Sequence, residues 1–204
     1  MKIQVENISK RFKKEWIFKS LSYTFSIGKT YALTGSNGSG KSTLIKILSA
    51  QDHANSGTIS YLLEDKKVPI YDFNNHYTFC APYQELILEM KLSEFLNFHL
   101  SMAKEHFSIP ELLEIVNLTG NENKVLNNFS SGMIQRLKLG ICFFSNRPVL
   151  FLDEPTSNLD EAGKAVFKSL INKNKQDKLI IMASNEPFEI DLCDEQLAVV
   201  DFKS

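Results

Sequence analysis

A glycine-rich stretch in the first quarter of the chain has the residue types and spacing of a phosphate-binding loop. "GSNGSGKST" fits the pattern G-x-x-x-x-G-K-[ST], with Gly35, Gly40, Lys41 and Ser42 at the fixed positions. Glycines let backbone N–H groups curl around phosphate oxygens without Cβ clashes, and a following helix adds the positive end of its dipole. Lys41 can bridge β- and γ-phosphate oxygens, and the Ser42 hydroxyl can ligate Mg²⁺. The residues expected to bind phosphate are Gly35, Ser36, Asn37, Gly38, Ser39, Gly40, Lys41, Ser42 and Thr43.

The flanks of this stretch favour the same interpretation. "TYAL", residues 30–33, is typical of a short strand, and "STLIKILSA" after the lysine has its apolar residues at helical spacing. An ordinary glycine-rich turn would not need a strand before it and a helix after it. We therefore expect a nucleoside triphosphate site here.

Two acidic residues end a second apolar run, "VLFL", residues 149–152. A fully buried strand is expected there, which places Asp153 at its carboxyl end and Glu154 one residue later. Asp153 can hold Mg²⁺ through water, and Glu154 can polarise an attacking water molecule. A buried strand can also simply end in acids where it meets solvent. In a chain that carries a phosphate loop, the catalytic interpretation is the better one.

The segment "NFSSGMIQRLKL" places Ser130, Ser131 and Gly132 directly before an amphipathic helix. Ser130 can be an ordinary N-cap of that helix. The free N–H groups, the hydroxyl and the helix dipole can equally form a second anion site. The spacing alone leaves both interpretations open.

A third apolar run, "IIMA", residues 180–183, stops at Ser184 and is followed by Asn185. If the run is a buried parallel strand, Asn185 lies just past its carboxyl end, where open α/β sheets place ligand chemistry. Asparagine also favours turns, and Pro187 follows two residues later. Without further motifs, Asn185 is either a site residue or a turn residue.

The hydrophobic pattern predicts one nucleotide-binding core that is interrupted by a helical lobe. Apolar and polar residues alternate up to "TISYLL", which indicates β structure, and apolar residues recur at helical spacing between about residue 83 and 146. The last part returns to α/β, with strands predicted at "VLFL", "LIIMA" and "LAVV" and a helix near 161–172.

Composition limits the possible partners and location. The chain has 204 residues, 43% of them hydrophobic, and a net charge of −1, which argues against a broad nucleic-acid-binding face. Its three cysteines lack metal-ligand spacing, so we expect reduced thiols. The amino terminus has no apolar signal region, and no apolar run approaches the roughly 18 residues that span a bilayer. We expect a chain that is soluble by itself and needs another chain for any membrane spans.

Four motifs in this order, "GSNGSGKST", "FSSGMIQR", "FLDEP" and "SNLD", resemble those of an ABC ATPase, the ATP-binding subunit (nucleotide-binding domain) of an ABC transporter. The resemblance covers essentially the whole chain. The compact size of the chain resembles that of the small cassettes of heme-exporter-like systems. The resemblance implies an α/β fold with a P-loop NTPase (RecA-like) core, an antiparallel β subdomain and an inserted α-helical subdomain. The core with its β subdomain would comprise residues 1–82 and 147–204, and the helical subdomain residues 83–146.

The resemblance gives the serine-glycine element a function. "FSSGM" corresponds to the family signature L-S-G-G-Q, in which Ser130 and Gly132 match, while Ser131 replaces a glycine and Met133 replaces the glutamine. In the family this element faces the phosphate loop of a second subunit, so that two ATP molecules lie between two cassettes. Asp160 of "SNLD" resembles the D-loop residue that lines this interface.

The resemblance implies two further assignments, and each has an alternative. The family stacks an aromatic residue on adenine, and Phe12 lies at the matching distance before the phosphate loop, with Trp16 as a rival. Either aromatic could instead be a core residue. Gln84 is the only glutamine near the expected Q-loop and would ligate Mg²⁺, but counting back from "LSEFL" points nearer Pro82 or Tyr83, and an exposed polar residue is the alternative.

At Asn185 the family has a histidine. All four histidines of the chain precede Ser130, so none replaces it in sequence. An asparagine amide can donate a hydrogen bond to the γ-phosphate or position water, but it cannot titrate near neutral pH. The resemblance therefore makes Asn185 a catalytic candidate together with Lys41 and Glu154.

The function implied by the resemblance is an ATP-hydrolysing motor that uses ATP and Mg²⁺. Its partners would be a second ABC ATPase subunit, as a homodimer, and an integral membrane permease, but no nucleic acid. It would be cytoplasmic, held peripherally at the inner face of the cell membrane through the permease. A helical aromatic stripe is more often core than docking surface, but four aromatics are candidates for that contact: Phe79, Tyr83, Phe95 and Phe98. The alternative is a soluble ABC ATPase with a scaffold or regulatory role, and a co-purifying multi-span membrane protein would distinguish the two.

Overall fold

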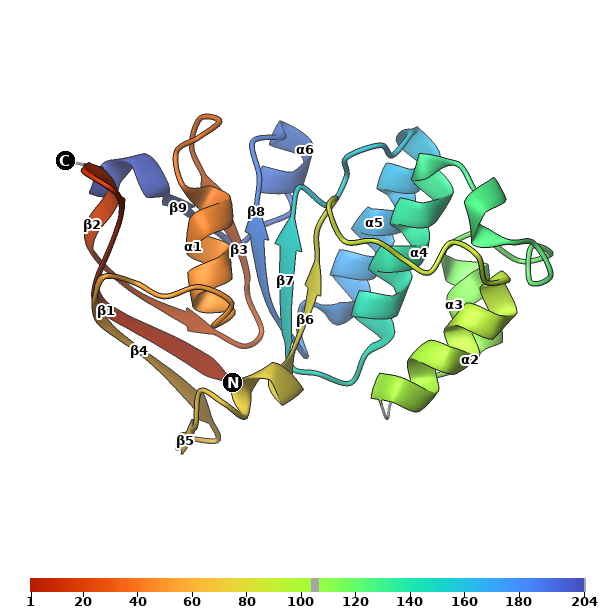
Figure 1. Ribbon diagram of the computed structural model, residues 1–204, viewed down its shortest axis with the longest axis horizontal. Coiled ribbons are helices and arrows are strands. Elements are labelled where there is room, and N and C mark those ends of the chain that lie inside the picture. The colour runs from red at the N-terminus through yellow and green to blue at the C-terminus, as the bar shows by residue number, and fades with distance from the viewer. Residues whose placement is uncertain (104–106, 204) are drawn as a thin grey trace. The chain divides into compact units, whose positions relative to one another are not determined.

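The computed structural model describes residues 1–103 and 107–203, and the chain divides into two compact units (Figure 1). The first unit comprises Met1–Phe79, Arg147–Glu154 and Lys175–Ser204. The second comprises Cys80–Asn146 and Pro155–Asn174. Each unit has its own buried apolar cluster, so each is described by itself.

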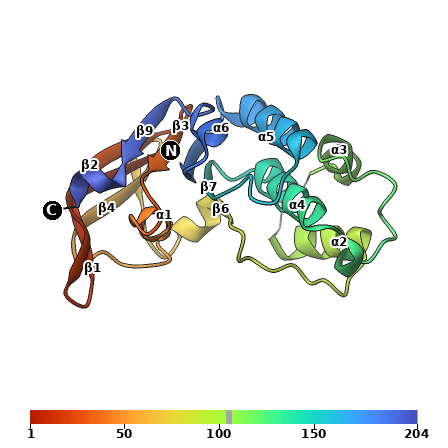
Figure 2. The ribbon, with the colours of Figure 1, turned by 90° about the horizontal axis from the view of Figure 1, so that it is seen from above.

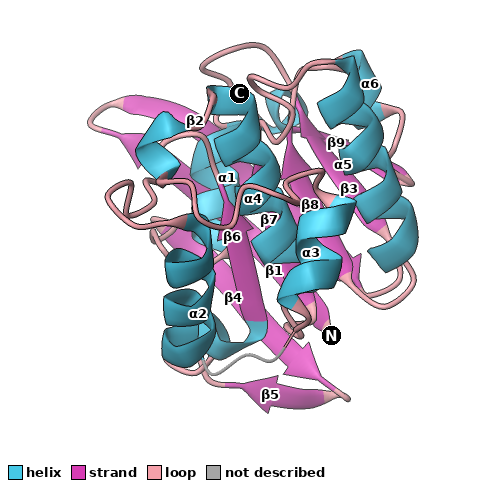
Figure 3. Cartoon of the chain, turned by 90° about the vertical axis from the view of Figure 1, so that its right-hand side faces the viewer, coloured by secondary structure: helices cyan, strands magenta, loops and turns pink. Residues whose placement is uncertain are grey.

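The first unit contains an antiparallel sheet with the strand order β2-β1-β4-β5 (Figure 3). Its strands are β1 (Lys2–Phe12), β2 (Glu15–Ser26), β4 (Ser56–Leu63) and β5 (Lys66–Val68). The alternation of apolar residues places one face of this sheet in the core. Three of the side chains buried on that face lie in register across the sheet: Ile3, Phe25 and Tyr61.

The second sheet of this unit has the order β6-β7-β8-β3-β9 and carries the candidate site. Its strands are β3 (Thr30–Thr34), β6 (Tyr77–Cys80), β7 (Val149–Asp153), β8 (Leu179–Ala183) and β9 (Glu195–Ala198). β3, β7, β8 and β9 run parallel, so their carboxyl ends meet at one edge. Every residue of β7 and β8 is buried, which explains why these strands are continuous apolar runs.

Short helical elements complete the first unit. Helix α1 (Lys41–Leu48) follows β3 and contacts β7 and β8, and α6 (Pro187–Ile190) follows β8 (Figure 1). Two 3₁₀ turns, Phe73–His76 and Val199–Phe202, flank the sheet. The predicted strand "LAVV" is therefore only half right: β9 ends at Ala198, and the two valines begin the last 3₁₀ turn.

The second unit is helical, as the sequence predicts. It contains α2 (Leu92–Ala103), α3 (Ile109–Ile115), α4 (Ser131–Phe144) and α5 (Glu161–Asn174), together with the 3₁₀ turn Leu126–Asn128 (Figure 2). Apolar residues spaced three or four positions apart meet in its core. The buried residues at the centre of this cluster include Leu92, Leu96, Leu112, Val116 and Leu137.

The boundary between the two units differs from the expected one at residues 80–82 and 155–174, which belong to the second unit. Residues 155–174 lie between two core strands in sequence, so the sequence predicts them as part of the core. In the structure α5 belongs to the helical unit because its apolar face packs on α4, where the rings of Phe143 and Phe167 meet at 6.2 Å between centroids. Among the described residues, no helix is both long and apolar enough to cross a membrane.

Candidate nucleotide site

The glycine-rich loop connects β3 to α1, and two of its glycines are required by its geometry. Gly35 and Gly40 have φ angles of 143° and 103°, in the region that favours glycine. A Cβ on Gly35 would come within 2.6 Å of Ser39 Oγ, and a Cβ on Gly40 would overlap with the side chain of Ile17. The loop conformation therefore depends on both glycines, as the motif predicts.

Lys41 lies inside this loop. Its Nζ donates hydrogen bonds to the carbonyl oxygens of Gly35 at 2.8 Å and Ser36 at 3.2 Å. Burial lowers the pKa of Lys41 from its ordinary value, while the nearby carboxylates of Glu154 and Asp153 oppose that shift. The loop thus holds a cation among backbone groups at the amino end of a helix, an arrangement suited to phosphate.

Ser42 and Asp153 form a contact that joins α1 to the end of β7. Ser42 Oγ donates to Asp153 Oδ1 at 3.0 Å, across 111 positions of sequence. Asp153 is only 4% exposed, and burial raises the pKa of its carboxyl group, while the hydrogen bond from Ser42 lowers it. A carboxylate and a hydroxyl oxygen beside a phosphate loop are the hard oxygen ligands that Mg²⁺ prefers. These residues therefore fit the magnesium ion that the motif implies.

Glu154 follows β7 with an unusual backbone conformation. Its φ angle is 46°, which is uncommon for a residue with a side chain. Its N–H donates to the carbonyl oxygen of Ala183 at 3.0 Å, so the neighbouring strand β8 holds the strained residue in place. Such strain is often found at active sites. Its side chain is exposed and lines the same pocket as Lys41.

That pocket has a volume of about 340 Å³ and lies wholly within the first unit. Phe12 lines it and is 51% exposed, so this ring is not a core residue. Lys10 Nζ lies 5.1 Å from the centroid of the Phe12 ring. Trp16 does not line the pocket, and its ring is covered by Arg11 and Lys19. The geometry therefore favours Phe12 over Trp16 beside the phosphate loop.

Asn185 also contacts the loop. Its Nδ2 donates to Asn37 Oδ1 at 2.6 Å. The turn after β8 is stabilised instead by Ser184, whose Oγ accepts a hydrogen bond from the N–H of Glu186 at 2.9 Å. The side chain that stabilises the turn is therefore that of Ser184, whereas the side chain of Asn185 is exposed and bonded to the glycine-rich loop.

The signature residues lie in the second unit. Ser130 is the N-cap of α4, and its Oγ accepts a hydrogen bond from the N–H of Met133 at 3.2 Å. Ser130 and Ser131 are exposed. A Cβ on Gly132 would lie 3.0 Å from the carbonyl oxygen of Asn158, so this glycine lets α4 approach the D-loop segment closely. The N-cap interpretation is confirmed, and it leaves the hydroxyl at the exposed amino end of a helix.

Asp160, which the resemblance assigns to a D-loop, has a local role. Its Oδ1 accepts a hydrogen bond from the N–H of Gly163 at 2.8 Å, which caps the start of α5. Gln135 of α4 donates from Nε2 to the carbonyl oxygen of Pro155 at 2.7 Å. The signature helix and the D-loop segment are therefore joined within the second unit.

Gln84 belongs to the second unit as well. Its Oε1, the atom that would ligate Mg²⁺, accepts a hydrogen bond from the N–H of Ala81 at 2.9 Å. Its own N–H donates back to the carbonyl oxygen of Ala81 at 3.2 Å. Gln84 is half-buried in a tight turn, so the interpretation as a merely exposed polar residue is wrong.

Two of the four aromatic candidates for a docking surface pack in or against a hydrophobic core instead. Phe95 is 6% exposed within the core of the helical unit, and Phe79 packs against the core of the first unit. Tyr83 and Phe98 are exposed, at 54% and 41%. Phe95 is buried because it lies on the inner face of α2 with Leu92 and Leu96.

Ile17 is the pocket residue that sequence reasoning missed. It lies in β2, lines the pocket and packs against Gly40. An apolar residue in an alternating strand is normally assigned to the core, so the sequence holds no signal for this role. Only the close approach to the glycine identifies it.

Known proteins resemble this chain along most of its length. The sequence profile described as "ABC transporter" matches residues 18–157. The cytochrome c biogenesis ATP-binding export protein CcmA of Brucella abortus (strain 2308) is 31% identical over 195 residues, which cover 94% of this chain and 88% of that protein. The uncharacterized ABC transporter ATP-binding protein YybJ of Bacillus subtilis (strain 168) is 34% identical over 202 residues, with 94% and 89% covered.

Solved structures share the fold. A putative ABC transporter ATP-binding protein from Pyrococcus furiosus matches with a TM-score of 0.86 at 22% identity, over 100% of both chains. A post-hydrolysis state of the cassette MJ0796 bound to ADP and Pi matches with a TM-score of 0.77 at 19% identity, over 97% of this chain and 94% of that one. These likenesses confirm the predicted α/β fold with a P-loop NTPase core. The matched profile and relatives show that the chain belongs to the ABC transporter family, as an ATP-binding and ATP-hydrolysing subunit.

Proposed function

We propose that the pocket of the first unit is the ATP and Mg²⁺ site of a transporter motor, in which ATP closes a dimer of cassettes and hydrolysis reopens it. The contact between Ser42 and Asp153 carries this proposal. In this contact a hydroxyl oxygen and a carboxylate oxygen, the atom types that Mg²⁺ prefers, lie together beside the glycine-rich loop that holds Lys41, which supports the proposal. Glu154 lines the same pocket, so a group able to polarise water is available beside the phosphates.

In this proposal each site residue of the first unit has a separate role. Lys41 and the N–H groups of the loop bind the phosphates. Ser42 and Asp153 hold Mg²⁺, which neutralises charge on the phosphate oxygens when it is bound. Glu154 accepts a hydrogen bond from the attacking water and orients it. Asn185, whose amide now donates to Asn37, would donate that hydrogen bond to the γ-phosphate when nucleotide is bound.

Two further groups are assigned by this proposal. Phe12 stacks on adenine at the pocket, where half of its surface is exposed. Gln84, whose Oε1 accepts a hydrogen bond from Ala81 here, remains a proposed Mg²⁺ ligand. Its side-chain oxygen is of the type that Mg²⁺ accepts.

The second unit provides the surface for a partner cassette. Ser130, Ser131 and Gly132 lie at the amino end of α4, and the first two are exposed, so a hydroxyl, backbone N–H groups and the helix dipole are available to the γ-phosphate of ATP on a second copy. Asp160 ends the segment "SNLD", whose Asn158 lies close to Gly132 of α4. The solved cassette MJ0796, which shares this fold with a TM-score of 0.80, is described as dimeric. We expect a homodimer that drives a separate membrane permease from the cytoplasmic face of the cell membrane.

Substitution of the water-polarising carboxylate tests this proposal. Glu154→Gln keeps the size and hydrogen-bonding capacity of the side chain but removes the base, so turnover falls while ATP remains bound. With ATP present, the variant elutes as a dimer in size-exclusion chromatography, and it returns to monomer when ATP is withdrawn. Lys41→Ala is the matched control, because it removes phosphate binding and yields no dimer. Glu154→Gln protein that hydrolyses ATP at the wild-type rate would contradict the assigned role.

A further inference from the structure

Lys10 is a buried cation near the carboxyl end of β1, two residues before Phe12, and is 7% exposed. Its Nζ donates hydrogen bonds to Asp52 Oδ1 at 2.8 Å and to the carbonyl oxygen of His53 at 2.6 Å. Asp52 Oδ2 also lies 2.8 Å from this nitrogen. The hydrogen bond from Lys10 holds the pKa of Asp52 below its ordinary value, so the two groups form an ion pair at neutral pH. All four residues belong to the first unit.

The residues that bind Lys10 lie just after α1, the helix that begins at the glycine-rich loop. Their segment, residues 52–55, is joined to the end of β1 at two further points. The N–H of Asn55 donates to the carbonyl oxygen of Ser9 at 2.8 Å, and Asn55 Oδ1 accepts a hydrogen bond from the N–H of Arg11 at 2.8 Å. The end of β1 is therefore fixed to the segment that follows α1.

The ammonium group of Lys10 also lies over the ring of Phe12. Its Nζ is 5.1 Å from the ring centroid, which is within the range of a cation–π contact. Phe12 is half exposed and lines the pocket beside the glycine-rich loop. The cation thus occupies one face of the ring, and the other face is left for a flat ligand.

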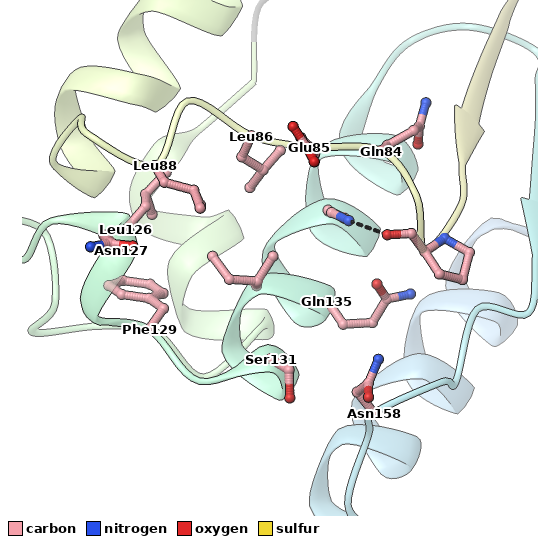
Figure 4. A pocket seen from close by; sticks show the side chains of 13 residues that line it. Gln84, Glu85, Leu86, Leu88, Leu126, Asn127, Phe129, Ser131, Gln135 and Asn158 are labelled. Atoms are coloured by element: carbon pink, nitrogen blue, oxygen red, sulfur yellow. Dashed lines mark hydrogen bonds between the residues drawn. The ribbon is translucent and has the colours of Figure 1, made fainter.

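Burial alone does not require this set of contacts. Lys138 of α4, in the second unit, is 8% exposed and so nearly as buried as Lys10. Its Nζ donates to the carbonyl oxygen of Pro82 at 3.2 Å, drawn as the dashed line in Figure 4 among the residues that line a pocket of that unit. A carbonyl oxygen is thus an adequate acceptor for a buried lysine in this chain. Lys10 has such a carbonyl in His53, so its carboxylate partner and its place over a ring need another explanation.

We propose that Lys10, held by Asp52, is a positioning residue that orders the Phe12 ring for stacking on adenine. The inference rests on the proposed adenine contact of Phe12. A half-exposed aromatic side chain that is not held in place has to be ordered when a base binds to it, and this ordering lowers the affinity. The cation fixes the ring before the base arrives. Because Asp52 follows α1, the same ion pair also links the position of the ring to the helix that carries the glycine-rich loop.

Calorimetric titration of the full chain with ATP and with inorganic triphosphate, without Mg²⁺ so that no turnover occurs, tests this inference. Lys10→Met keeps much of the side-chain volume but removes the charge. It should weaken ATP binding about two- to tenfold, the cost of ordering one side chain on binding, and leave triphosphate binding unchanged. Lys10→Arg can still pair with Asp52 and should bind ATP nearly as wild type does. Lys14→Met removes the same charge from an exposed position between β1 and β2 and should change neither affinity.

Two further variants separate positioning from simple attraction between a cation and ATP. Asp52→Ala removes a negative charge and releases Lys10. Attraction alone would make this variant bind ATP and triphosphate more tightly, whereas positioning makes it bind ATP more weakly and triphosphate equally well. In a Phe12→Ala background, Lys10→Met should have no further effect on ATP binding, since the ring that Lys10 orders is gone. The side chain of Asp52 is partly exposed, so Asp52→Ala tests the inference even where Lys10→Met does not fold.

The outcomes distinguish this inference from the adenine contact on which it rests. If Phe12→Ala weakens ATP binding but folded Lys10→Met and Asp52→Ala do not, the inference is wrong and the adenine contact stands. Equal weakening for ATP and triphosphate in Lys10→Met would assign Lys10 to the phosphates and would also overturn the inference. So would a further loss in the Phe12→Ala background. If Phe12→Ala binds ATP as tightly as wild type, the adenine contact and the inference both fail.

Discussion

The side-chain amide of Asn185 donates a 2.6 Å hydrogen bond to the side-chain oxygen of Asn37, which joins the end of β8 to the phosphate loop. A histidine at position 185, as in the related family, could gain or lose a proton near neutral pH. An amide cannot titrate there, so its contact with the loop is the same at every pH in that range. The pair therefore gives this chain a pH-independent link between the end of β8 and the glycine-rich loop.

Asn185→Ala should slow turnover by about 10²–10³-fold, the usual cost of losing one preorganised donor at a site of developing charge. Asn37→Ala separates two ways in which Asn185 can act. If Asn185 acts by holding the loop through Asn37, the two single variants and the double variant should have equal turnover. If Asn185 donates to the γ-phosphate itself, Asn37→Ala should be much milder. Near-normal turnover in Asn185→Ala would leave Asn185 with no part in the reaction.

Asp153→Asn should stabilise the nucleotide-free protein while impairing its activity. Burial raises the pKa of Asp153 in the folded state, so the folded chain holds this proton more tightly than the unfolded chain does. Stability therefore falls as the pH rises through the interval between the ordinary pKa and the raised one, and the ionised group remains destabilising at neutral pH. Asparagine removes that cost and can still accept the hydrogen bond from Ser42.

Thermal unfolding of the nucleotide-free Asp153→Asn variant should give a higher Tm than wild type at pH 7, and this difference should shrink in acid. Mg²⁺-dependent turnover should be largely lost, because the charged ligand is gone. Ser42→Ala is the companion variant. It also removes a Mg²⁺ ligand, but it should lower stability, since Asp153 would lose its hydrogen bond. A lower Tm for Asp153→Asn would show that its charge is compensated in the folded state.

Gly40→Ala should destabilise the protein more than Gly38→Ala does. Both glycines have positive φ angles, 103° and 77°, so alanine costs about 1–2 kcal/mol at either position. Only at Gly40 does the new Cβ also overlap with Ile17, whereas a Cβ on Gly38 meets no atom within 4 Å. Chemical denaturation measures the two differences in the free energy of unfolding. Ile17→Ala should recover part of the loss in Gly40→Ala and none in Gly38→Ala, and equal losses in both single variants would contradict the packing described here.

The sequence predicts the parts of this molecule that depend on local pattern. The apolar runs that became β7 and β8 are recognisable because strands buried on both faces lack polar alternation. The phosphate loop follows from a spacing that fixes glycines and a lysine before a helix. "LAVV" was only half right because Val199 is buried in the 3₁₀ turn just as it would be in a strand. Apolar content alone cannot tell these two conformations apart.

Features that depend on distant contacts could not be predicted in this way. The Ser42–Asp153 contact could be expected because both residues belong to motifs, but the Asn37–Asn185 contact spans 148 positions and follows from no pattern. α5 lies between two core strands in sequence, and only its packing on α4 shows that it belongs to the helical unit. Ile17 has the pattern of a core residue, yet it lines the pocket beside the glycine-rich loop.

Phe12→Ala should weaken ATP binding, because the proposed stacking of adenine on an aromatic ring is worth about 1–3 kcal/mol. This corresponds to roughly 5- to 150-fold in Kd. Trp16→Ala is the matched control: Trp16 lies in the same hairpin but does not line the pocket, so its loss should leave Kd nearly unchanged. Isothermal titration calorimetry with ATP measures both.

Inorganic triphosphate provides the second control for this pair of variants. It carries the phosphates without the base, so Phe12→Ala should bind it as tightly as wild type does. Equal weakening for ATP and triphosphate would mean that the variant disturbs the phosphate loop, which lies across the same pocket. A larger loss of ATP affinity in Trp16→Ala than in Phe12→Ala would assign the adenine contact to Trp16. The Trp16 ring would then have to lose its contacts with Arg11 and Lys19.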